Sequence, residues 1–515
     1  MKKIITLIGL SFLQANVKGQ NTVWVEQGKA PKTERGNAIA HDNNGNLYIT
    51  GDFQDSVRFN SILLTDAFGN YCAKYDTTGN IIWAFNNLGG SGVTFDGSSN
   101  IYLYNNFNQS LQKVGLNGTV VWNNNLFTSS TFGSCGIQDV YVKGTDIYVT
   151  GFYSGDAYFT SDTLFNSSAS GWDIFIAKFN SSGVFQWAKT AGGIGLDKGY
   201  GIYVNNMDEL YAIGYFTDDA YFESTQLMSI GLQDMYLAKY GSSGNLLWAY
   251  NYGGTGLDLA AKIIADDNNY IYTTGRYNNS INFGTTTLNS ANTDAFIAKF
   301  DSNGNPIWAK GISGVGNDEE ADIDYENGKL AFIATTAGNV SISTFNLTAL
   351  GNLDICIGKI DTAGTVLWTK LLGGVTDDEG SGVTLLNNST YFNGSFKTSA
   401  NFDAFSLISL GQWDIVTGKL DNQVISGIIQ LGETEFPISI HPNPFSSQTI
   451  MQTDYPLQNA TLIVENYFGQ TVKQIINISG QTVILTRDNL PSGLYFIRLT
   501  EDSKVIATKK LLIAD

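Results

Sequence analysis

Acidic side chains are the residues of this 515-residue chain whose type and spacing are best suited to chemistry. Two dense groups precede strand-like segments late in the chain: Asp318, Glu319, Glu320 and Asp322, and then Asp377, Asp378 and Glu379. Carboxylate oxygens are the ligands that calcium prefers, and two carboxylates facing each other across a cleft are what a glycosidase needs. Acid-rich loops are also typical of solvated surface, so a calcium site, a catalytic pair and a plain loop all stay open.

Two tryptophans add a second kind of candidate. Trp172 and Trp413 occupy a loop position that other copies of an internal repeat fill with Gly69, Gln233, Thr293 or Leu353. An indole exposed there could stack on sugar rings, whereas a covered one packs beneath its loop. Together with six of the acids they form the candidate ligand site, which comprises Trp172, Trp413, Asp318, Glu319, Glu320, Asp377, Asp378 and Glu379.

Catalytic signatures are scarce. The only histidines are His41 and His441, which nearly excludes a histidine-based metal site or catalytic triad. The sequence contains no G-x-S-x-G, Walker, H-E-x-x-H or C-x-x-C motif. The glycine-rich run 192–197 recurs between repeats, which favours a turn over a phosphate cradle. We expect no catalytic residue and no cofactor other than calcium.

The charge balance narrows the choice of partner. The chain carries 47 acidic residues against 29 lysines and arginines, a formal net charge of −18. Such a surface repels nucleic acid and anionic lipid. Three cysteines are too few for a disulfide framework, and we expect Cys72 and Cys356 to be small buried side chains. Cation binding or simple solubility fits this acidic balance better than a nucleic-acid or lipid partner.

The first residues have the pattern of a secretory signal. Lys2 and Lys3 precede an apolar run from Ile4 to Leu13, and small or polar residues follow up to Gly19. Ten apolar residues are too few to span a bilayer. We expect a signal peptide over residues 1–19 and no transmembrane segment.

A recurring tryptophan reveals repeats of about sixty residues. Its copies are Trp24, Trp83, Trp122, Trp187, Trp248, Trp308 and Trp368. Each repeat holds four strand-like segments joined by short polar turns, as in 261–267, 270–275, 295–300 and 305–310. The pattern predicts an all-β fold with a seven-bladed β-propeller over residues 20–431.

The strand count predicts how the ring closes. The fourth segment has one surplus copy, around Trp24 or around residues 424–429, and a closed ring needs one of them to complete the blade formed by the other end. The long connections from strand two to three and from four to one share a face, which we expect to bind ligands. Blade two lacks most of its two-to-three connection between Asn105 and Leu111, which predicts a notch.

Residues 173–189, 234–249 and 294–310 match the pattern D-x-F-[IL]-A-K-[FY]-D-x-x-G-N-x-x-W-A-K. In this respect the chain resembles the β-propeller repeat family of secreted bacterial proteins, over roughly residues 24–430. The resemblance implies a propeller scaffold without implying any one activity. The aspartate that opens strand three is expected to cap a turn in five copies, namely Asp173, Asp234, Asp294, Asp354 and Asp414.

After a linker at 432–436, residues 437–515 predict a small Ig-like β-sandwich of about seven short strands. This segment resembles the type A C-terminal sorting domain of the type IX (Por) secretion system. The matching residues are Pro442, Asn443, Pro444, Gly469, Gly493, Tyr495, Lys509 and Lys510. The resemblance implies handling by the type IX machinery, removal of the domain, and release or attachment to surface lipopolysaccharide.

These features predict a protein exported through the periplasm to the cell surface or the medium. The leading interpretation is a non-enzymatic propeller that binds or adheres to a glycan or protein through its variable face. The alternative is a carbohydrate-active enzyme that uses paired carboxylates on that face. A purely structural surface protein is the third interpretation.

Overall fold

The computed structural model describes residues 20–106, 108–129, 135–168, 171–319, 322–421, 438–466, 471–501 and 504–514. The expected signal peptide, the expected linker, Glu320 and Gly469 lie outside these residues. The chain divides into two compact units, Met1–Asn422 and Gln423–Asp515. Throughout the described residues both units consist of strands and turns, which confirms the all-β prediction.

Within the described residues, the first unit contains seven four-stranded antiparallel blades. Blade one has β2 (Glu34–His41), β3 (Leu47–Phe59), β4 (Ile62–Tyr75) and β5 (Ile81–Asn86); blade two has β6 (Gly92–Phe95), β7 (Asn100–Asn105), β8 (Ser110–Gly115) and β9 (Val120–Asn125). Blade three has β11 (Cys135–Lys143), β12 (Asp146–Tyr153), β15 (Asp173–Asn180) and β16 (Phe185–Gly193); blade four has β17 (Lys198–Val204), β18 (Leu210–Phe216), β21 (Asp234–Tyr240) and β22 (Leu246–Tyr252). Blade five has β23 (Leu259–Ala265), β24 (Ile271–Phe283), β25 (Thr286–Phe300) and β26 (Pro306–Gly314); blade six has β27 (Ile323–Glu326), β28 (Lys329–Ala337), β31 (Leu353–Asp361) and β32 (Val366–Gly374). Blade seven has β33 (Asp378–Leu386), β34 (Ser389–Phe396), β37 (Asp414–Asp421) and β1 (Asn21–Lys29).

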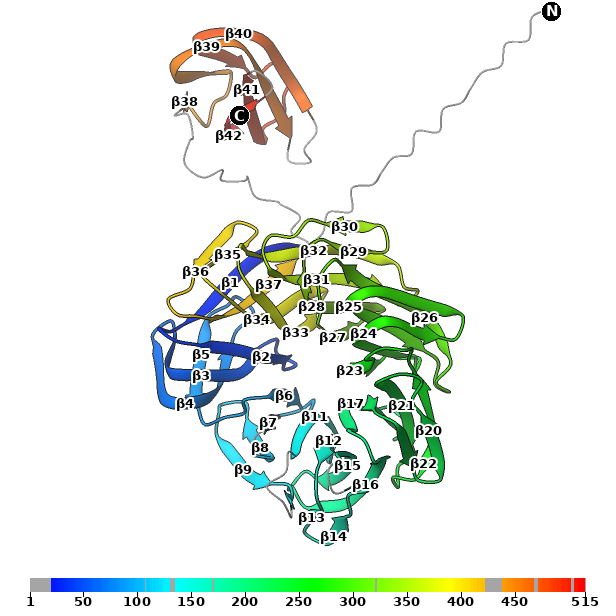
Figure 1. Cartoon of the computed structure of the whole chain (residues 1–515). Coiled ribbons are helices and arrows are strands. Elements are labelled where there is room, and N and C mark those ends of the chain that lie inside the picture. Colours follow the sequence, from blue (N-terminus) through cyan, green and yellow to red (C-terminus); the bar gives the residue numbers. More distant parts are fainter. Residues whose placement is uncertain are drawn as a thin grey trace, which may run out of the picture. The chain divides into compact units, whose positions relative to one another are not determined.

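The blades form a ring with the first strand of each blade at the centre (Figure 1). The N-terminal strand β1 closes this ring, because it pairs antiparallel with β37 and so supplies the outer strand of blade seven. The other candidate for the ring-closing strand, residues 424–429, lies outside the described residues. Closure pairs a sheet edge that would otherwise invite association with other chains.

The repeated turns form as their sequence predicts. Asp301 accepts the backbone N–H groups of Asn303 and Asn305 at 2.9 and 2.8 Å. Gly304 follows with φ of 85°, a conformation that costs other residues energy. This turn joins strands three and four of blade five.

Repeated tryptophans and strand-three lysines join several blades to the next blade by hydrogen bonds. Trp308 Nε1 donates to the carbonyl oxygen of Thr362 at 3.3 Å, and Lys299 Nζ donates to the same oxygen at 2.8 Å. Lys299 also lies over the ring of Tyr272, 5.1 Å from its centroid. Similar tryptophan bonds join Trp24 to Thr77, Trp83 to Leu116, and Trp122 to Ser181. These four tryptophans thus each form a hydrogen bond to the neighbouring blade.

Several two-to-three connections are hairpins rather than open loops. They are formed by β13 (Ala157–Phe159) with β14 (Asp162–Leu164), β19 (Asp219–Phe222) with β20 (Thr225–Met228), β29 (Val340–Ile342) with β30 (Phe345–Leu347), and β35 (Ser399–Phe402) with β36 (Phe405–Ile408). Figure 1 shows these hairpins at the rim. The strands β19, β29 and β35 pair with the outer strand of the preceding blade, and the short β10 (Thr128–Ser129) pairs with β13.

The pairing of these hairpins with the outer strand of the preceding blade explains a repeated glycine at the end of strand four. A Cβ on Gly193 or Gly374 would overlap the carbonyl oxygen of Asp219 or Ser399 on the adjoining hairpin. The sequence predicts that the glycine-rich run forms a turn. The structure adds a second role, because only a residue without a side chain leaves room for the hairpin of the next blade. In blade two, only residues 106–109 separate β7 from β8, as the sequence predicts.

The second unit has five strands in its described residues. These are β38 (Ile438–His441), β39 (Gln448–Asn466), β40 (Thr471–Thr486), β41 (Gly493–Glu501) and β42 (Lys504–Ile513). They pair in the order β38-β39-β41-β42, and β40 also pairs with β39. The sequence predicts about seven short strands, whereas the structure has fewer and longer ones, because β39 and β40 continue through several register shifts. Met451, Leu462 and Leu499 lie in the buried core of this unit.

Candidate functional site

The predicted acids of blades six and seven do not gather at one point. Asp318 and Asp378 are fully buried and accept backbone N–H groups from Ala337 at 2.9 Å and Gly374 at 2.6 Å. Burial, reinforced by a neighbouring aspartate, raises the pKa of each to about 7. These two side chains therefore cap loops inside the ring and present no open carboxylate.

The other predicted acids within the described residues also have partners. Asp377 forms an ion pair with Lys397 at 2.5 Å, and Glu379 forms one with Arg35 at 2.8 Å. Glu319 bridges to Thr335 through its backbone. Over the part of the chain that the structure describes, no three acids, histidines or cysteines are grouped as metal ligands. A calcium site stays a prediction without a located position.

The two predicted tryptophans lie in unlike surroundings. Trp413 is only 7% exposed, and the cations of Arg35 and Lys397 lie 4.9 and 4.3 Å from its ring centroid. Trp172 is half-buried, with its ring 5.0 Å from that of Phe152 and with Lys198 Nζ 5.3 Å from its centroid. The arrangement at Trp413 fits the packing interpretation rather than sugar stacking.

A charged contact crosses the centre of the ring. Lys262 of blade five donates to Asp139 of blade three at 2.9 Å, and Asp139 also accepts the backbone N–H of Ile202 at 3.0 Å. Asp322 accepts the N–H of Val383 at 3.1 Å, and burial raises its pKa to about 6 even though Lys262 favours the carboxylate. Lys262 with Asp139 thus joins the innermost strands of blades five and three, and Asp322 joins blade six to blade seven.

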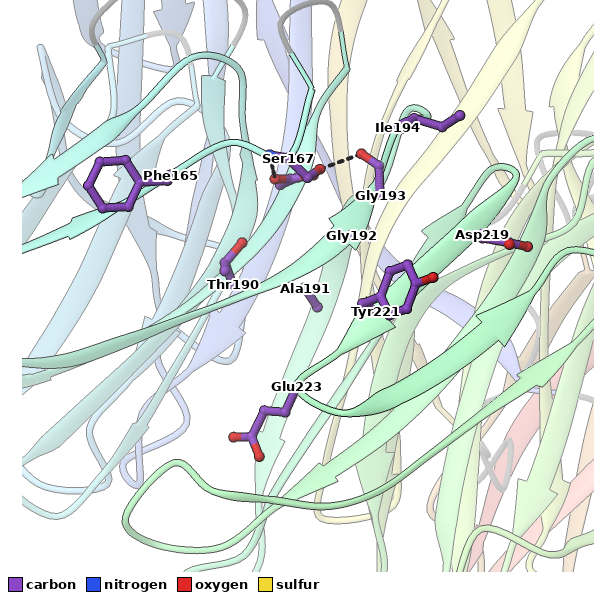
Figure 2. Close-up of a pocket in the computed structure, with 11 residues that line it drawn as sticks. Phe165, Ser167, Thr190, Ala191, Gly192, Gly193, Ile194, Asp219, Tyr221 and Glu223 are labelled. Atoms are coloured by element: carbon purple, nitrogen blue, oxygen red, sulfur yellow. Dashed lines mark hydrogen bonds between the residues drawn. The ribbon is translucent and has the colours of Figure 1, made fainter.

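A groove lies between blades three and four, where blade four's hairpin adjoins the outer strand of blade three (Figure 2). Its volume is about 540 Å³. The lining comes from the end of β16, from the loop after β14, and from β19 with the turn that follows it: Phe165, Ser167, Asp173, Thr190, Ala191, Gly192, Gly193, Ile194, Asp219, Tyr221 and Glu223. The groove thus uses segments from both sides of a blade junction.

Apolar side chains dominate the open part of the groove. Phe165, Ile194 and Tyr221 are 70%, 73% and 50% exposed, and all three line this one groove. The carboxylates of Asp219 and Glu223 lie on the same wall as Tyr221 in Figure 2. Aromatic faces beside carboxylates suit a ligand that has both apolar faces and hydrogen-bond donors.

Hydrogen bonds fix the groove floor. The backbone N–H of Ser167 donates to Asp173 Oδ2 at 2.6 Å, and the Ser167 hydroxyl is within hydrogen-bonding distance of Asp173 Oδ1 and the carbonyl of Gly193. Burial raises the pKa of Asp173 above its ordinary range, although the bonds from Ser167 act against the rise. The predicted turn cap at Asp173 is therefore also part of a ligand-sized groove.

Asp173 and residues 192–194 were assigned to turns, and the other groove residues were missed by sequence reasoning. One signal was present, because blade three has eight residues between β14 and Asp173 while blade four has five between β20 and Asp234. That insertion carries Phe165 and Ser167 into the groove. This difference in length was overlooked because the repeats were compared for what they share.

The sorting residues of the second unit lie together. Asn443 donates to the carbonyl of Lys510 at 2.8 Å and accepts the N–H of Leu512 at 2.8 Å. The Tyr495 hydroxyl donates to the carbonyl of Pro491 at 2.9 Å, and Gly493 opens β41. The predicted motif thus joins the start of this unit to its last strand.

Comparison with known proteins agrees with this architecture. Residues 439–514 match the family model of the secretion system C-terminal sorting domain. An uncharacterized WD repeat-containing protein of Acanthamoeba polyphaga mimivirus is 21% identical over 474 residues, which cover 75% of this chain and 32% of that protein. The chain therefore spans about a third of the length of that curated relative.

Two solved structures are also similar. BamB of Moraxella catarrhalis has 13% identity and a TM-score of 0.35, with 78% of this chain and 99% of that chain covered. Hydrazine synthase of Kuenenia stuttgartiensis has 12% identity and a TM-score of 0.39, with coverage of 73% and 97%.

The closed ring of antiparallel blades makes this chain a β-propeller repeat protein. Its second unit carries the C-terminal sorting domain of the type IX secretion system, which directs export to the cell surface or the extracellular medium. No helix in the described ranges is long and apolar enough to cross a membrane.

Proposed function

We propose that this exported propeller is a non-enzymatic binding protein that holds a glycan in the groove between blades three and four. The observation that carries the proposal is the exposure of Phe165, Ile194 and Tyr221 around one groove of about 540 Å³. Large apolar side chains gathered at a concave surface are typical of ligand sites.

The chemistry of the lining supports a glycan. Aromatic rings such as Phe165 and Tyr221 offer flat faces to the C–H faces of a sugar ring. Asp219 and Glu223 can accept hydrogen bonds from sugar hydroxyls. The acidic groove and the net charge of −18 disfavour polyanionic polymers. A neutral or amino-containing saccharide is the best fit, and a protein ligand is the competing outcome.

The groove favours binding over glycoside hydrolysis. Asp219 lies in β19 and Glu223 in the turn that follows it, so both carboxylates belong to one hairpin and one wall of the groove. Paired catalytic carboxylates in glycosidases instead flank the scissile bond. The acids predicted for that role are used elsewhere, with Asp378 buried and Glu379 paired to Arg35.

Export supplies the biological setting for such binding. We propose that residues 1–19 direct passage into the periplasm and that the sorting domain is then removed, leaving the ring free or attached to surface lipopolysaccharide. Either outcome places the groove outside the cell, where glycans are available.

A glycan screen tests the proposed function. The full chain would be applied to an array of neutral, amino-containing and anionic saccharides, and hits would be repeated with the double variant Phe165→Ala plus Tyr221→Ala. We expect neutral or amino-containing hits that the double variant loses. The variant Phe68→Ala is the matched control, because Phe68 is 81% exposed on blade one and lies outside the groove. Absence of any saccharide hit would reject the glycan.

A further inference from the structure

Pairs of buried acids lie at the junctions between neighbouring blades. In each pair, the aspartate that opens strand three of one blade meets an acid at or near the start of strand one of the next blade. Five such pairs occur in the described residues: Asp173 with Asp197, Asp234 with Asp258, Asp294 with Asp318, Asp354 with Asp378, and Asp414 with Glu34. Every one of the ten side chains is at most 2% exposed.

Glycine at the end of strand four allows the two acids to approach. A Cβ on Gly192 would contact Asp173 Oδ1 and would lie 2.8 Å from Asp197 Oδ2. One carboxylate oxygen of Asp173 and one of Asp197 therefore both lie beside the backbone of Gly192. Gly373 has the same position beside Asp378, whose Oδ2 would lie 2.5 Å from an added Cβ. The closeness of the acids is thus built into the repeat.

In four of the five pairs, all except Asp173 with Asp197, hydrogen bonding leaves at least one carboxylate oxygen without a partner among the described residues. Asp354 Oδ2 accepts the N–H of Leu350 at 2.8 Å and Asp378 Oδ2 accepts that of Gly374 at 2.6 Å, while both Oδ1 atoms lack a partner in the part of the chain described. Asp294 Oδ1 and Asp318 Oδ2 are similarly unpartnered, as are Asp234 Oδ1 and both carboxylate oxygens of Glu34. Buried oxygens without a donor are costly and need an explanation.

The titratable groups that face the pairs are acids, tyrosine hydroxyls and the thiol of Cys356, which lies near Asp318 and Asp354. Around the strand-one acids these are Asp218 near Asp197, Asp377 near Asp378 and Asp52 near Glu34. The tyrosines are Tyr153 near Asp173, Tyr215 and Tyr236 near Asp197, Tyr277 near Asp294 and Asp318, and Tyr71 near Glu34. Lys397, the nearby cation, is paired with Asp377. Two adjacent buried carboxylates without a cation of their own cannot both stay ionised cheaply.

We propose that each of these acid pairs shares one proton between its two carboxyl groups, so that the blades are joined by hydrogen bonds that exist only while the proton is bound. A shared proton supplies the missing donor to one unpartnered oxygen and halves the buried charge. Asp354 with Asp378 and Asp294 with Asp318 fit best, because each partner offers one free oxygen. The ring is therefore a pH-sensitive assembly.

The direction of the pH effect follows from the pKa values. Burial raises the pKa of Asp197, Asp258, Asp318 and Asp378 to about 7, and that of Glu34 to about 9, with the partner's charge adding to each rise. The pKa values of aspartate and glutamate side chains in an unfolded chain are about 4. Because the folded pKa is the higher one, this stabilisation is complete below about pH 4 and is lost as pH rises to about 7, or about 9 for Glu34.

Thermal unfolding of the full chain tests the proposal. The Tm would be measured from pH 5 to pH 8 at constant ionic strength, for the wild type and for Asp318→Asn plus Asp378→Asn. We expect the wild-type Tm to fall by several degrees with rising pH and the double variant to lose part of that slope, since asparagine cannot titrate. A wild-type Tm that is constant or rises across this range would overturn the proposal.

The matched control is Asp301→Asn, which also replaces a turn aspartate. The amides around Asp301 outweigh its slight burial and lower its pKa, so the pH slope above pH 5 should not change. Infrared spectroscopy of the folded wild type provides a second measurement that needs no variant. The carbonyl band of protonated carboxylic acids should be present at pH 6 and lost by pH 10. Absence of that band at pH 6, together with a Tm raised by calcium at pH 8 and lowered by a chelator, would show a cation in place of the proton.

Discussion

The ammonium group of Lys262 lies 2.9 Å from the carboxylate of Asp139, two blades away around the ring. The Lys262 side chain is 38% exposed and that of Asp139 is 5% exposed, so one end of this ion pair is desolvated. Although burial alone would lower it, the charges of Asp139 and Asp322 raise the pKa of Lys262. The pair ties innermost strands that are not neighbours.

Replacing Lys262 by methionine should destabilise the propeller. The change leaves Asp139 and Asp322 without their cation, and we expect a loss of about 1 to 3 kcal/mol in the free energy of unfolding at neutral pH. Denaturant titration followed by tryptophan fluorescence would measure it. Lys189→Met on the outer strand β16 is the control, and an equal loss in both variants would contradict the central role of Lys262.

The hydrogen bond from Trp308 to Thr362 can be removed while a smaller aromatic ring is kept. Trp308→Phe keeps an aromatic ring but deletes the Nε1 donor, which bonds to blade six at 3.3 Å. We expect a loss of about 1 kcal/mol, whereas Trp308→Ala should cost about 3 to 5 kcal/mol. If the phenylalanine variant is as stable as the wild type, the indole contributes through packing alone.

Ring closure by β1 predicts a clear effect of truncation. Deleting residues 20–29 removes the outer strand of blade seven and exposes an edge of β37. We expect self-association and loss of cooperative unfolding, measured by light scattering and calorimetry. A chain that ends at Asn422 retains β1 and should remain monomeric and cooperative. If the chain that ends at Asn422 self-associates and the chain without residues 20–29 unfolds cooperatively, the strand at residues 424–429 closes the ring instead.

Deleting residues 437–515 should trap the protein in the periplasm, because the sorting domain lies within them. Cell fractionation and immunoblotting would locate the product. Asn443→Ala is a finer test, since it removes both bonds that join the motif to β42 and should reduce export while leaving the ring intact. Normal export of the deleted chain would refute a sorting role for this segment.

Local and repeated features were predictable from sequence. The Asp301 to Gly304 turn and the tryptophan of strand four recur with the same neighbours, so their structure depends on short segments. The acids of blades six and seven were predicted as a site because they are dense in sequence. Their roles depend instead on distant partners, as in the pair of Glu379 with Arg35, which are 344 residues apart.

The groove was beyond sequence reasoning for the same reason. Phe165 comes from an insertion in blade three and Tyr221 from the hairpin of blade four, and only the pairing of β16 with β19 brings them to one surface. The exposure of a side chain, unlike its place in a repeat, depends on which neighbouring blade covers it. Trp413 shows the opposite outcome. It belongs to the candidate ligand site predicted from the sequence, but Arg35 and Lys397 cover its ring.

The most direct test of the proposed binding groove is isothermal titration of the full chain with its best saccharide hit. We expect Phe165→Ala plus Tyr221→Ala to weaken binding at least tenfold, equivalent to about 1.4 kcal/mol, with no change in Tm because both side chains are largely exposed. Phe68→Ala should bind as the wild type does. Unchanged affinity in the double variant would contradict the assignment of the ligand site to this groove.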